Sequence, residues 1–288
     1  MSLAVAAGTP HVAGGLHLIV RAYRPLNPLA SMAMEQQVLD TVGRFYSRRA
    51  RHSLHTLEPG AIVVVEPTGT NDPWPPHRRL VLWMGVLADR AVLVASSEFT
   101  ATLCEAVAEV DKPAELMEPK TIADLTTRCR ALAGGSRDLQ PYMGRKYCCD
   151  SAMLRPVHDA NVQRLAPENA PGAMHALRSV GIPDALAYLL AEDAAFAYFL
   201  DGDPVAFAAT HPAGGMSGSV GDVMVGTLEG YRRRGFGKAV ISATTAAVVA
   251  RGKVAVWGMS HDNVGAMRTA SSIGYQQYCE LLELRSAV

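Results

Sequence analysis

The sequence has no excess of either charge and no long apolar run. Its 288 residues include 27 Lys and Arg against 27 Asp and Glu, so the formal net charge is zero. A chain without an excess of positive charge lacks the overall electrostatic attraction that favours binding to nucleic acid or to an anionic membrane surface. No segment approaches the roughly 18–20 apolar residues that a membrane-spanning helix needs, and residues 1–13 lack the basic n-region of a signal peptide. We therefore expect no nucleic-acid partner and no membrane association.

Cysteine is sparse and shows no recurring spacing. The 5 cysteines make an odd number, no two stand as Cys-x-x-Cys, and none combines with histidine in a metal-ligand pattern. They are Cys104, Cys129, Cys148, Cys149 and Cys279. Free thiols in a reducing compartment are the simplest explanation, so we expect a cytoplasmic protein with no bound metal.

The composition is that of a globular protein with a substantial core. Apolar residues make up 49% of the chain and charged residues 19%, and the length allows two domains. Residues 1–31 predict an irregular leader, either disordered or available to add a strand to a partner. We expect an α+β domain of unknown role over 32–150 and a second domain over 151–288.

Hydrophobic periodicity predicts the elements of both domains. In the first we expect a helix over 34–50, strands over 61–65, 80–87 and 91–95 with a loop at 68–77, and helices over 99–110 and 122–133. The second domain is expected to begin with a strand over 153–157, a helix after Pro171 and a helix over 183–191. Strands over 194–200, 205–210 and 223–225 should follow. The domain should then end with a helix over 237–250, a strand over 253–259, a helix over 263–274 and a strand over 276–284. Asp201-Gly202 predicts a tight hairpin turn.

A basic, glycine-punctuated turn stands between the strand at 223–225 and the helix at 237–250. The first N–H groups of a helix have no partner within the helix and lie at the positive end of its dipole, so they bind anions. Gly235 and Gly237 let the backbone approach a phosphate, and Arg232, Arg233 and Arg234 add positive charge. This pattern predicts a pyrophosphate-binding turn.

Two well-known phosphate-binding turns do not fit this segment. A Walker A loop needs Ser or Thr after Gly237-Lys238, and Ala239 stands there. A dinucleotide fingerprint needs a third small residue where Val240 stands and an acidic residue about 20 positions later, where the sequence has Trp257-Gly258 instead. A nucleotide-binding protein of another fold therefore remains a weak alternative.

The spacing Arg232-x-x-Gly235-x-Gly237 resembles the acyl-CoA-binding motif of the GCN5-related N-acetyltransferase (GNAT) superfamily. A second segment, with Asn263, Ala266, Gly274 and Tyr275 in the order and spacing of that family, follows the next strand. Asn263 is a suitable N-cap and Gly274 a suitable end for the helix between them. The resemblance covers residues 219–285 and extends loosely back to about residue 152.

The resemblance implies an α/β fold with an α+β mixed sheet, in which a GNAT domain follows a smaller N-terminal α+β domain. Acetyl-CoA, or another acyl-CoA, would lie between the family's fourth and fifth strands. The implied cofactor-binding residues are Val225, Gly226, Thr227, Arg232, Arg233, Arg234, Gly235, Phe236, Gly237, Lys238 and Asn263. Among the backbone groups, the N–H near Val225 would stabilise the developing oxyanion.

The catalytic residues are less well specified than the cofactor site. Many family members carry a tyrosine that protonates the departing thiolate, and this chain has Ala270 in its place. Tyr275 occupies the family's aromatic packing position, and Tyr278 on the last strand is a weak substitute. A general base is needed to deliver a neutral amine. The first candidate for this base is Asp222. His261 follows, because histidine is suited to proton transfer near neutral pH, and Glu229 and His211 come last.

We expect an acyl-CoA-dependent N-acetyltransferase in which the amine of a small molecule attacks the thioester directly in a ternary complex. The alternatives are a GNAT-fold protein with other chemistry, such as O-acyl transfer, hydrolysis or decarboxylation, and a non-catalytic acyl-CoA sensor. A homodimer is a further expectation left open. The sequence does not specify the acceptor or the acyl group.

Overall fold

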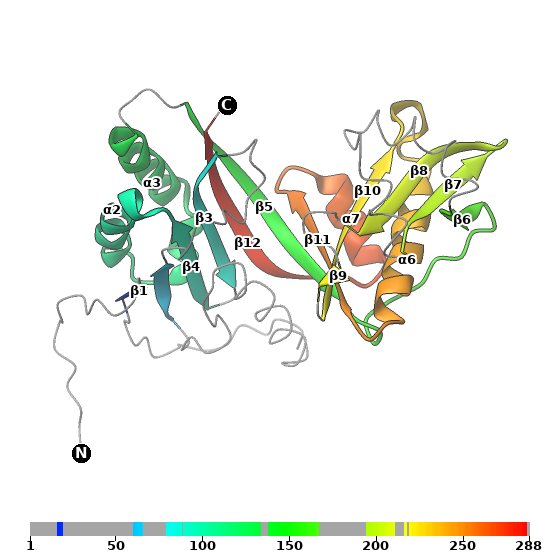
Figure 1. Ribbon diagram of the computed structural model, residues 1–288, viewed down its shortest axis with the longest axis horizontal. Coiled ribbons are helices and arrows are strands. Elements are labelled where there is room, and N and C mark those ends of the chain that lie inside the picture. The colour runs from blue at the N-terminus through cyan, green and yellow to red at the C-terminus, as the bar shows by residue number, and fades with distance from the viewer. Residues whose placement is uncertain are drawn as a thin grey trace, which may run out of the picture. The chain divides into compact units, whose positions relative to one another are not determined.

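A computed structural model describes residues 16–19, 60–65, 79–87, 89–133, 138–166, 194–210, 216–217 and 219–286. The chain divides into two compact units (Figure 1). Unit 1 comprises Met1–Ala33, Tyr46–Gly144 and Cys279–Val288, and unit 2 comprises Met34–Phe45 and Arg145–Tyr278. Each unit combines segments that are separated in the sequence. The expected elements at 34–50 and 68–77, after Pro171 and over 183–191 lie outside the described residues.

Unit 1 is a mixed sheet with helices packed on one face. Its strands are β1 (Leu16–Ile19), β2 (Ile62–Val65), β3 (Arg79–Leu87), β4 (Arg90–Ala95), the first part of β5 (Leu139–Cys149) and the last part of β12 (Gln276–Ser286). Their order is β1-β2-β4-β3-β12-β5. β3 and β4 form the expected hairpin, and β12 pairs antiparallel with β3 from Glu280 to Ser286.

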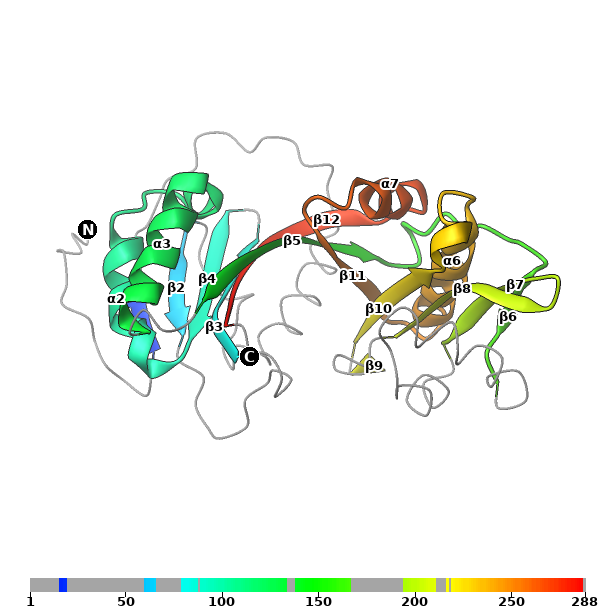
Figure 2. The same ribbon diagram turned by 90° about the horizontal axis from the view of Figure 1, so that it is seen from above.

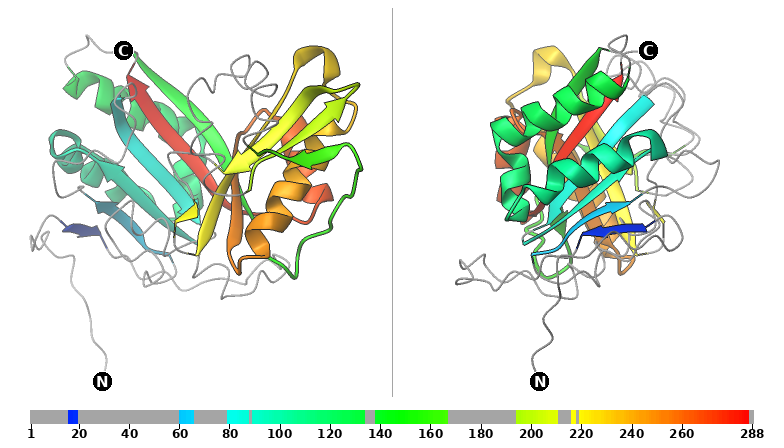
Figure 3. Two further views of the ribbon diagram at one scale, coloured as in Figure 1. Left: turned by 45° about the vertical axis from the view of Figure 1, so that its right-hand side comes forward. Right: turned by 90° about the vertical axis from the view of Figure 1, so that its left-hand side faces the viewer.

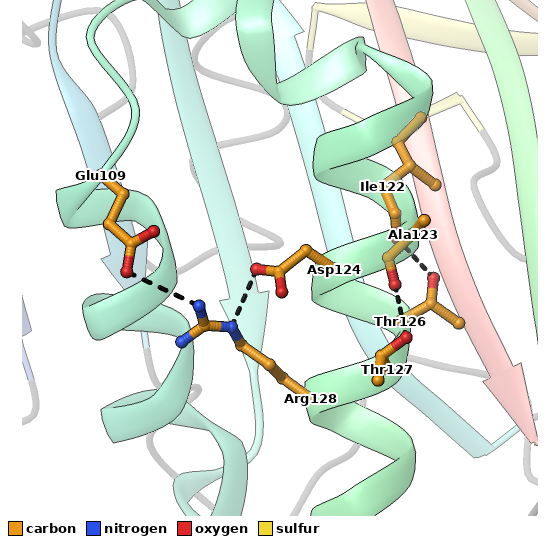
Figure 4. A network of polar contacts seen from close by, with 7 residues as sticks. All are labelled: Glu109, Ile122, Ala123, Asp124, Thr126, Thr127 and Arg128. Atoms are coloured by element: carbon orange, nitrogen blue, oxygen red, sulfur yellow. Dashed lines mark hydrogen bonds and ion pairs between the residues drawn. The ribbon is translucent and has the colours of Figure 1, made fainter.

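The helices of unit 1 are α2 (Ser97–Ala108), the 3-10 helix η2 (Pro113–Met117) and α3 (Pro119–Leu132). Phe99, Leu103 and Leu125 are buried in the core cluster shared with the sheet, and Figure 2 shows α2 and α3 on one face of it. Arg128 of α3 bonds Asp124 of its own helix at 2.8 Å and Glu109, just after α2, at 3.6 Å (Figure 4). These pairs are exposed and add little to the stability that the apolar contacts supply.

Unit 2 carries the segments that matched the family pattern. Its strands are the last part of β5, β6 (Val162–Arg164), β7 (Phe196–Leu200), β8 (Asp203–Thr210), β9 (Met216–Ser217), β10 (Val220–Thr227), β11 (Val254–Ser260) and the start of β12. The order is β5-β11-β10-β8-β7-β6, and β9 pairs with β10. Asp201 and Gly202 both have positive φ, 53° and 90°, as the expected hairpin turn between β7 and β8 requires.

Helices α6 (Phe236–Val249) and α7 (Val264–Ser272) pack against one face of this sheet. A single core cluster joins Ile241 of α6 and Ala270 of α7 to Val223 of β10 and Trp257 of β11. Asn263 caps α7, since its Oδ1 accepts a hydrogen bond from the N–H of Ala266 at 3.0 Å. None of the helices in the described ranges has the length and apolar character needed to cross a bilayer.

Three expectations about local structure were wrong. Residues 153–157 form no strand: the N–H of Arg155 bonds the carbonyl of Ile273, and the N–H of Val157 bonds the Ser242 hydroxyl. Eleven residues at the expected boundary form β5 instead. The leader predicted as irregular contains β1, which pairs antiparallel with β2.

Candidate acyl-CoA site

Strands β10 and β11 run parallel and then part. Their pairing extends from Val220 opposite Val254 to Val223 opposite Trp257, and stops there. β10 continues to Thr227 on its other partner, β8, while β11 continues to Ser260 (Figure 3). From Met224 onward β10 therefore has an edge that no longer pairs with β11. An extended ligand with amide groups can pair with such an edge as an added strand would.

Hydrogen-bond alternation shows which backbone groups face this opened edge. The N–H of Leu228 bonds the carbonyl of Val205 on β8 at 3.0 Å. Because backbone groups alternate sides along a strand, Gly226 likewise faces β8, opposite Phe207. The N–H groups of Val225 and Thr227 therefore point toward the gap that opens beside β11. Gly226, although expected in the site, does not offer its backbone there.

The turn after β10 is shaped by two residues in the left-handed region. The 3-10 helix η3 (Glu229–Tyr231) follows β10, then Arg233 has φ 63° and Gly235 has φ 90°. Gly235 is the N-cap of α6, and its carbonyl accepts the N–H of Ala239 at 3.1 Å. No side chain caps this helix. The first N–H groups of α6, from Phe236 to Lys238, thus have no partner within the helix and suit an anionic ligand.

Gly237 is required for the contact between α6 and β10. A Cβ built on Gly237 would lie 2.8 Å from Thr227 Oγ1 and 3.8 Å from Val225 Cγ2. The start of the helix therefore lies against the strand whose backbone faces the gap. A Cβ on Gly235 would meet nothing within 4 Å, so that glycine is needed for its positive φ and not for space.

The arginines of the turn do not act as one cluster. Arg234 lies over the Phe236 ring at 4.8 Å and near the Tyr231 ring at 5.7 Å, so its guanidinium stacks on aromatic faces. Arg232 donates from Nε to the carbonyl of Thr227 at 3.3 Å. Arg233 is exposed at the turn. Because the bond to Thr227 uses only Nε of Arg232, the terminal NH2 groups of that arginine would donate to phosphates at the helix start without breaking it.

Asp222 and His261, the two preferred base candidates, lie in different parts of unit 2. Asp222 is half-buried on β10 opposite Val256, within the paired part of the strands. His261 is exposed in the turn after β11, and Val256 to Ser260 already spans about 13 Å of strand. The two side chains therefore do not form a pair. Glu229 is exposed in η3, and His211 lies outside the described residues.

Tyr275 does not replace the proton donor that is missing at Ala270. Tyr275 is buried, shares a 2.8 Å hydrogen bond with Thr245 of α6 and meets Trp257 edge to face. Burial raises the pKa of Tyr275 well above the usual range, and this effect outweighs the opposing effect of the hydrogen bond shared with Thr245. Tyr275 is therefore a packing residue, as the family pattern implied. Ala270 is fully buried in the core cluster.

Sequence reasoning missed one side chain at the point where the strands part. A Cβ on Gly258, the first β11 residue beyond the pairing, would lie 2.5 Å from the Nζ of Lys146 on β5. The lysine thus crosses to β11 through the space that a glycine leaves. No local signal could have found it, since Lys146 lies in a strand that the sequence did not predict.

One family model matches the part of the chain that contains this site. The family model described as FR47-like protein matches residues 206–283. This range runs from β8 through β10, the turn before α6, α6, β11 and α7 into β12. No curated protein sequence matches the chain.

Solved structures with related folds are distant. A GCN5-related N-acetyltransferase from Kribbella flavida is 19% identical over 90% of this chain and 97% of its own, with a TM-score of 0.45. An acetyltransferase of the GNAT family from Colwellia psychrerythraea is 13% identical over 55% of this chain, with a TM-score of 0.43, and the match spans 60% of that protein, less than two thirds of its length. A Salmonella typhimurium protein solved with its cofactor acetyl-CoA is 16% identical over 44% of this chain and 93% of its own, with a TM-score of 0.34. Scores this low do not carry a function from one protein to another.

Proposed function

We propose, from the premise that the C-terminal part of the chain is a domain of the GNAT superfamily, that this protein is an acyl-CoA-dependent N-acyltransferase. Its donor is acetyl-CoA and its acceptor is the amine of a small molecule. One observation carries the proposal: β10 and β11 part after Val223 and Trp257, and β10 then leads through a short turn to the start of α6, which has no side-chain cap. A strand edge and a helix N-terminus side by side suit a ligand with both amides and phosphates.

The residues present fit acyl-CoA in each of its parts. The N–H groups of Phe236, Gly237 and Lys238 would receive the pyrophosphate, and Gly237 lets the helix start lie against β10. The edge groups of Val225 and Thr227 would pair with the pantetheine amides. Acetyl-CoA would supply an activated acyl group as a thioester.

The chain would contribute positioning and charge stabilisation to the transfer. The N–H of Val225, aimed into the gap, would donate to the thioester oxygen as negative charge develops there. Asp222, on β10 three residues before Val225, would accept the proton from the acceptor amine. The buried Ala270 and Tyr275 offer no acid for the CoA thiolate. The thiolate would therefore take a proton from water in the site, or would be protonated in solution after CoA has left.

Calorimetry with acetyl-CoA tests the cofactor claim. We expect binding with micromolar affinity in the wild type and its loss in Gly235→Asp, which puts a carboxylate and a strained φ at the phosphate position. Gly230→Ala is the matched control, because a Cβ on Gly230 meets nothing within 4 Å and its φ is not positive. Absence of binding at millimolar acetyl-CoA, or equal binding in Gly235→Asp, would refute the proposal.

Ala270 specifically favours a second candidate, acyl-CoA binding with slow or different chemistry. Release of free thiol with a panel of amines, followed by mass spectrometry of the products, separates the two. Acylated amine formed in step with thiol release supports the transferase. Thiol release without acylated amine identifies a hydrolase, and tight binding without thiol release identifies a sensor.

A further inference from the structure

Lys146 and Asp222 lie on the same face of the unit 2 sheet. Tyr147 of β5 and Val223 of β10 both belong to the core cluster under α6 and α7. Side chains alternate faces along a strand, so their neighbours Lys146 and Asp222 point to the opposite face. The same alternation applies to Gly258 on β11, whose neighbours Trp257 and Met259 belong to that cluster. A Cβ built on Gly258 would lie 2.5 Å from Lys146 Nζ, which independently puts Gly258 and Lys146 on one face.

The spacing between these two groups suits one small molecule. Asp222 is paired with Val256, and Gly258 lies two residues farther along β11. With about 4.8 Å between strands and about 3.3 Å per residue, the Cα atoms of Asp222 and Gly258 are about 8 Å apart. An α-amino acid that donates from its amine to Asp222 and accepts at its carboxylate from Lys146 would lie between these strands, and each hydrogen bond would add about 2.8 Å to its reach.

We propose that Lys146 binds a carboxylate on the acceptor, so that the acceptor is an amino acid or a similar amine bearing an anion. The inference rests on the proposed function and adds the substrate class. Lys146 holds its ammonium beside the first β11 residue past the strand pairing, next to the gap assigned to the thioester. The amine of a molecule held there by its carboxylate lies toward Asp222 and the edge of β10. A positive charge at this point attracts a carboxylate and repels an acceptor that carries only amines.

Gly258 provides a variant that moves the ammonium without changing any charge. In Gly258→Ala the new methyl group would sit 2.5 Å from Nζ and 3.0 Å from Cδ and Cε of Lys146. The far end of a lysine is flexible, so the side chain shifts and the fold is kept. Lys146→Met removes the charge and keeps the length. Arg251→Met is the control, since Arg251 is an exposed cation after α6 whose NH1 bonds the Ala247 carbonyl.

The experiment measures kcat/KM with acetyl-CoA for a panel of α-amino acids and β-alanine, each beside its carboxamide. We expect the wild type and Arg251→Met to prefer the carboxylates by at least tenfold. Both Lys146→Met and Gly258→Ala should lose most of this preference while binding acetyl-CoA as the wild type does. Equal use of acids and amides by the wild type, or a preference unchanged in Lys146→Met, would overturn the inference. Either result would leave the proposed N-acyltransferase activity unaffected.

A binding measurement decides the case in which no amine is turned over, which would count against the proposed function itself. In the presence of CoA, the N-acetylated acids and their amides are titrated into the protein and followed by calorimetry. We expect the acids to bind at least tenfold more tightly than the amides, and Lys146→Met to abolish the difference. Equal binding of acid and amide refutes the carboxylate site regardless of activity.

Discussion

Gly237 shows how one missing side chain sets the geometry of the site. Its Cα lies so close to Thr227 that a methyl group would stand 2.8 Å from Oγ1. Contacts below about 3 Å between such atoms force a shift of helix or strand. Because we propose that the helix start and the strand edge bind different parts of one ligand, a small shift between them would weaken binding.

We therefore predict that Gly237→Ala lowers acetyl-CoA affinity by about tenfold and stability by about 1 kcal/mol. Thr227→Ala in the same chain should restore much of both, because it removes the Oγ1 that the methyl group meets. Gly230→Ala should change neither. Calorimetry and urea unfolding provide the two readouts. If Gly237→Ala binds as the wild type does, the close approach has no role in the site.

Asp222 and His261 can be separated as candidate bases. We predict that Asp222→Asn lowers kcat by about 10²–10⁴ with little change in the KM for acetyl-CoA, because Asp222 lies on β10 two residues before the edge that opens at Met224. His261→Gln should stay within a few-fold of the wild type, because the turn leaves that side chain exposed. The pH profile of kcat provides the second readout, since its acidic limb should vanish in Asp222→Asn. The reverse pattern would assign the base to His261.

At the level of elements, the N-cap of α7, Asn263, has a structural role and is also a proposed cofactor-binding residue. The Oδ1 of Asn263 accepts from the N–H of Ala266 and so caps the helix, while the amide Nδ2 is the group that remains to donate to a ligand. Asn was expected both as a cap and as a cofactor residue, and only the first role is confirmed.

We predict that Asn263→Asp keeps the stability of the protein, because aspartate caps as well as asparagine, but weakens acetyl-CoA binding by several-fold. Asn263→Ala should lose about 1 kcal/mol of stability as well. Thermal unfolding and calorimetry on the two variants distinguish the roles. Equal acetyl-CoA affinity in Asn263→Asp and the wild type would limit Asn263 to capping.

Elements with strong local signals were predicted from sequence, and those defined by distant partners were not. The Asp201-Gly202 turn, α6 and the capped α7 carry their own turn and cap residues, so their positions followed from the residues alone. β5 has Pro141, Gly144 and two adjacent cations, and its burial alternates irregularly. Its strand conformation is imposed by neighbours far away in sequence. The loss of pairing after Val223 is likewise a tertiary property, which the family resemblance implied and no periodicity could reveal.

For the molecule as a whole, buried thiols set an alkaline limit on stability. Burial raises the pKa of Cys129 to about 12, and burial with Asp150 nearby raises that of Cys149 to about 12. Unfolded thiols ionise near pH 8.5. Since the folded pKa is the higher one, the unfolded state loses its protons first as the pH rises. The stability contributed is complete below about pH 8.5 and is lost progressively toward about pH 12.

We predict that the free energy of unfolding falls above about pH 8.5, by up to about 1.4 kcal/mol per pH unit for each such thiol. Cys129→Ala and Cys149→Ala should each flatten the decline. In native protein at pH 8, the half-buried Cys104 should react with a thiol reagent before the four buried cysteines. Urea unfolding as a function of pH and mass mapping of labelled peptides test the two statements. Stability that is flat from pH 8 to 11 would contradict the assignment.

The C-terminal strand completes the core of unit 1. Leu282 and Leu284 are fully buried in the cluster formed with α2 and α3. We predict that Leu282→Ala costs about 2–5 kcal/mol and that the loss is concentrated in unit 1. Hydrogen exchange followed by mass spectrometry should show faster exchange in β3 and β4 and little change in α6. Uniform loss of protection in both units would instead show that they unfold as one cooperative body.

Because residues 279–286 close unit 1, the order of synthesis and the order of folding differ. The ribosome makes β2, β3 and β4 early, yet the strand that pairs with β3 is translated after all of unit 2. Until then the edge of β3 is an unpaired strand edge, which in a nascent chain is a point of misassociation. Unit 1 is thus translated first but can complete its sheet only after unit 2 has been translated. A growing chain of this protein would depend on chaperones longest at its amino-terminal end.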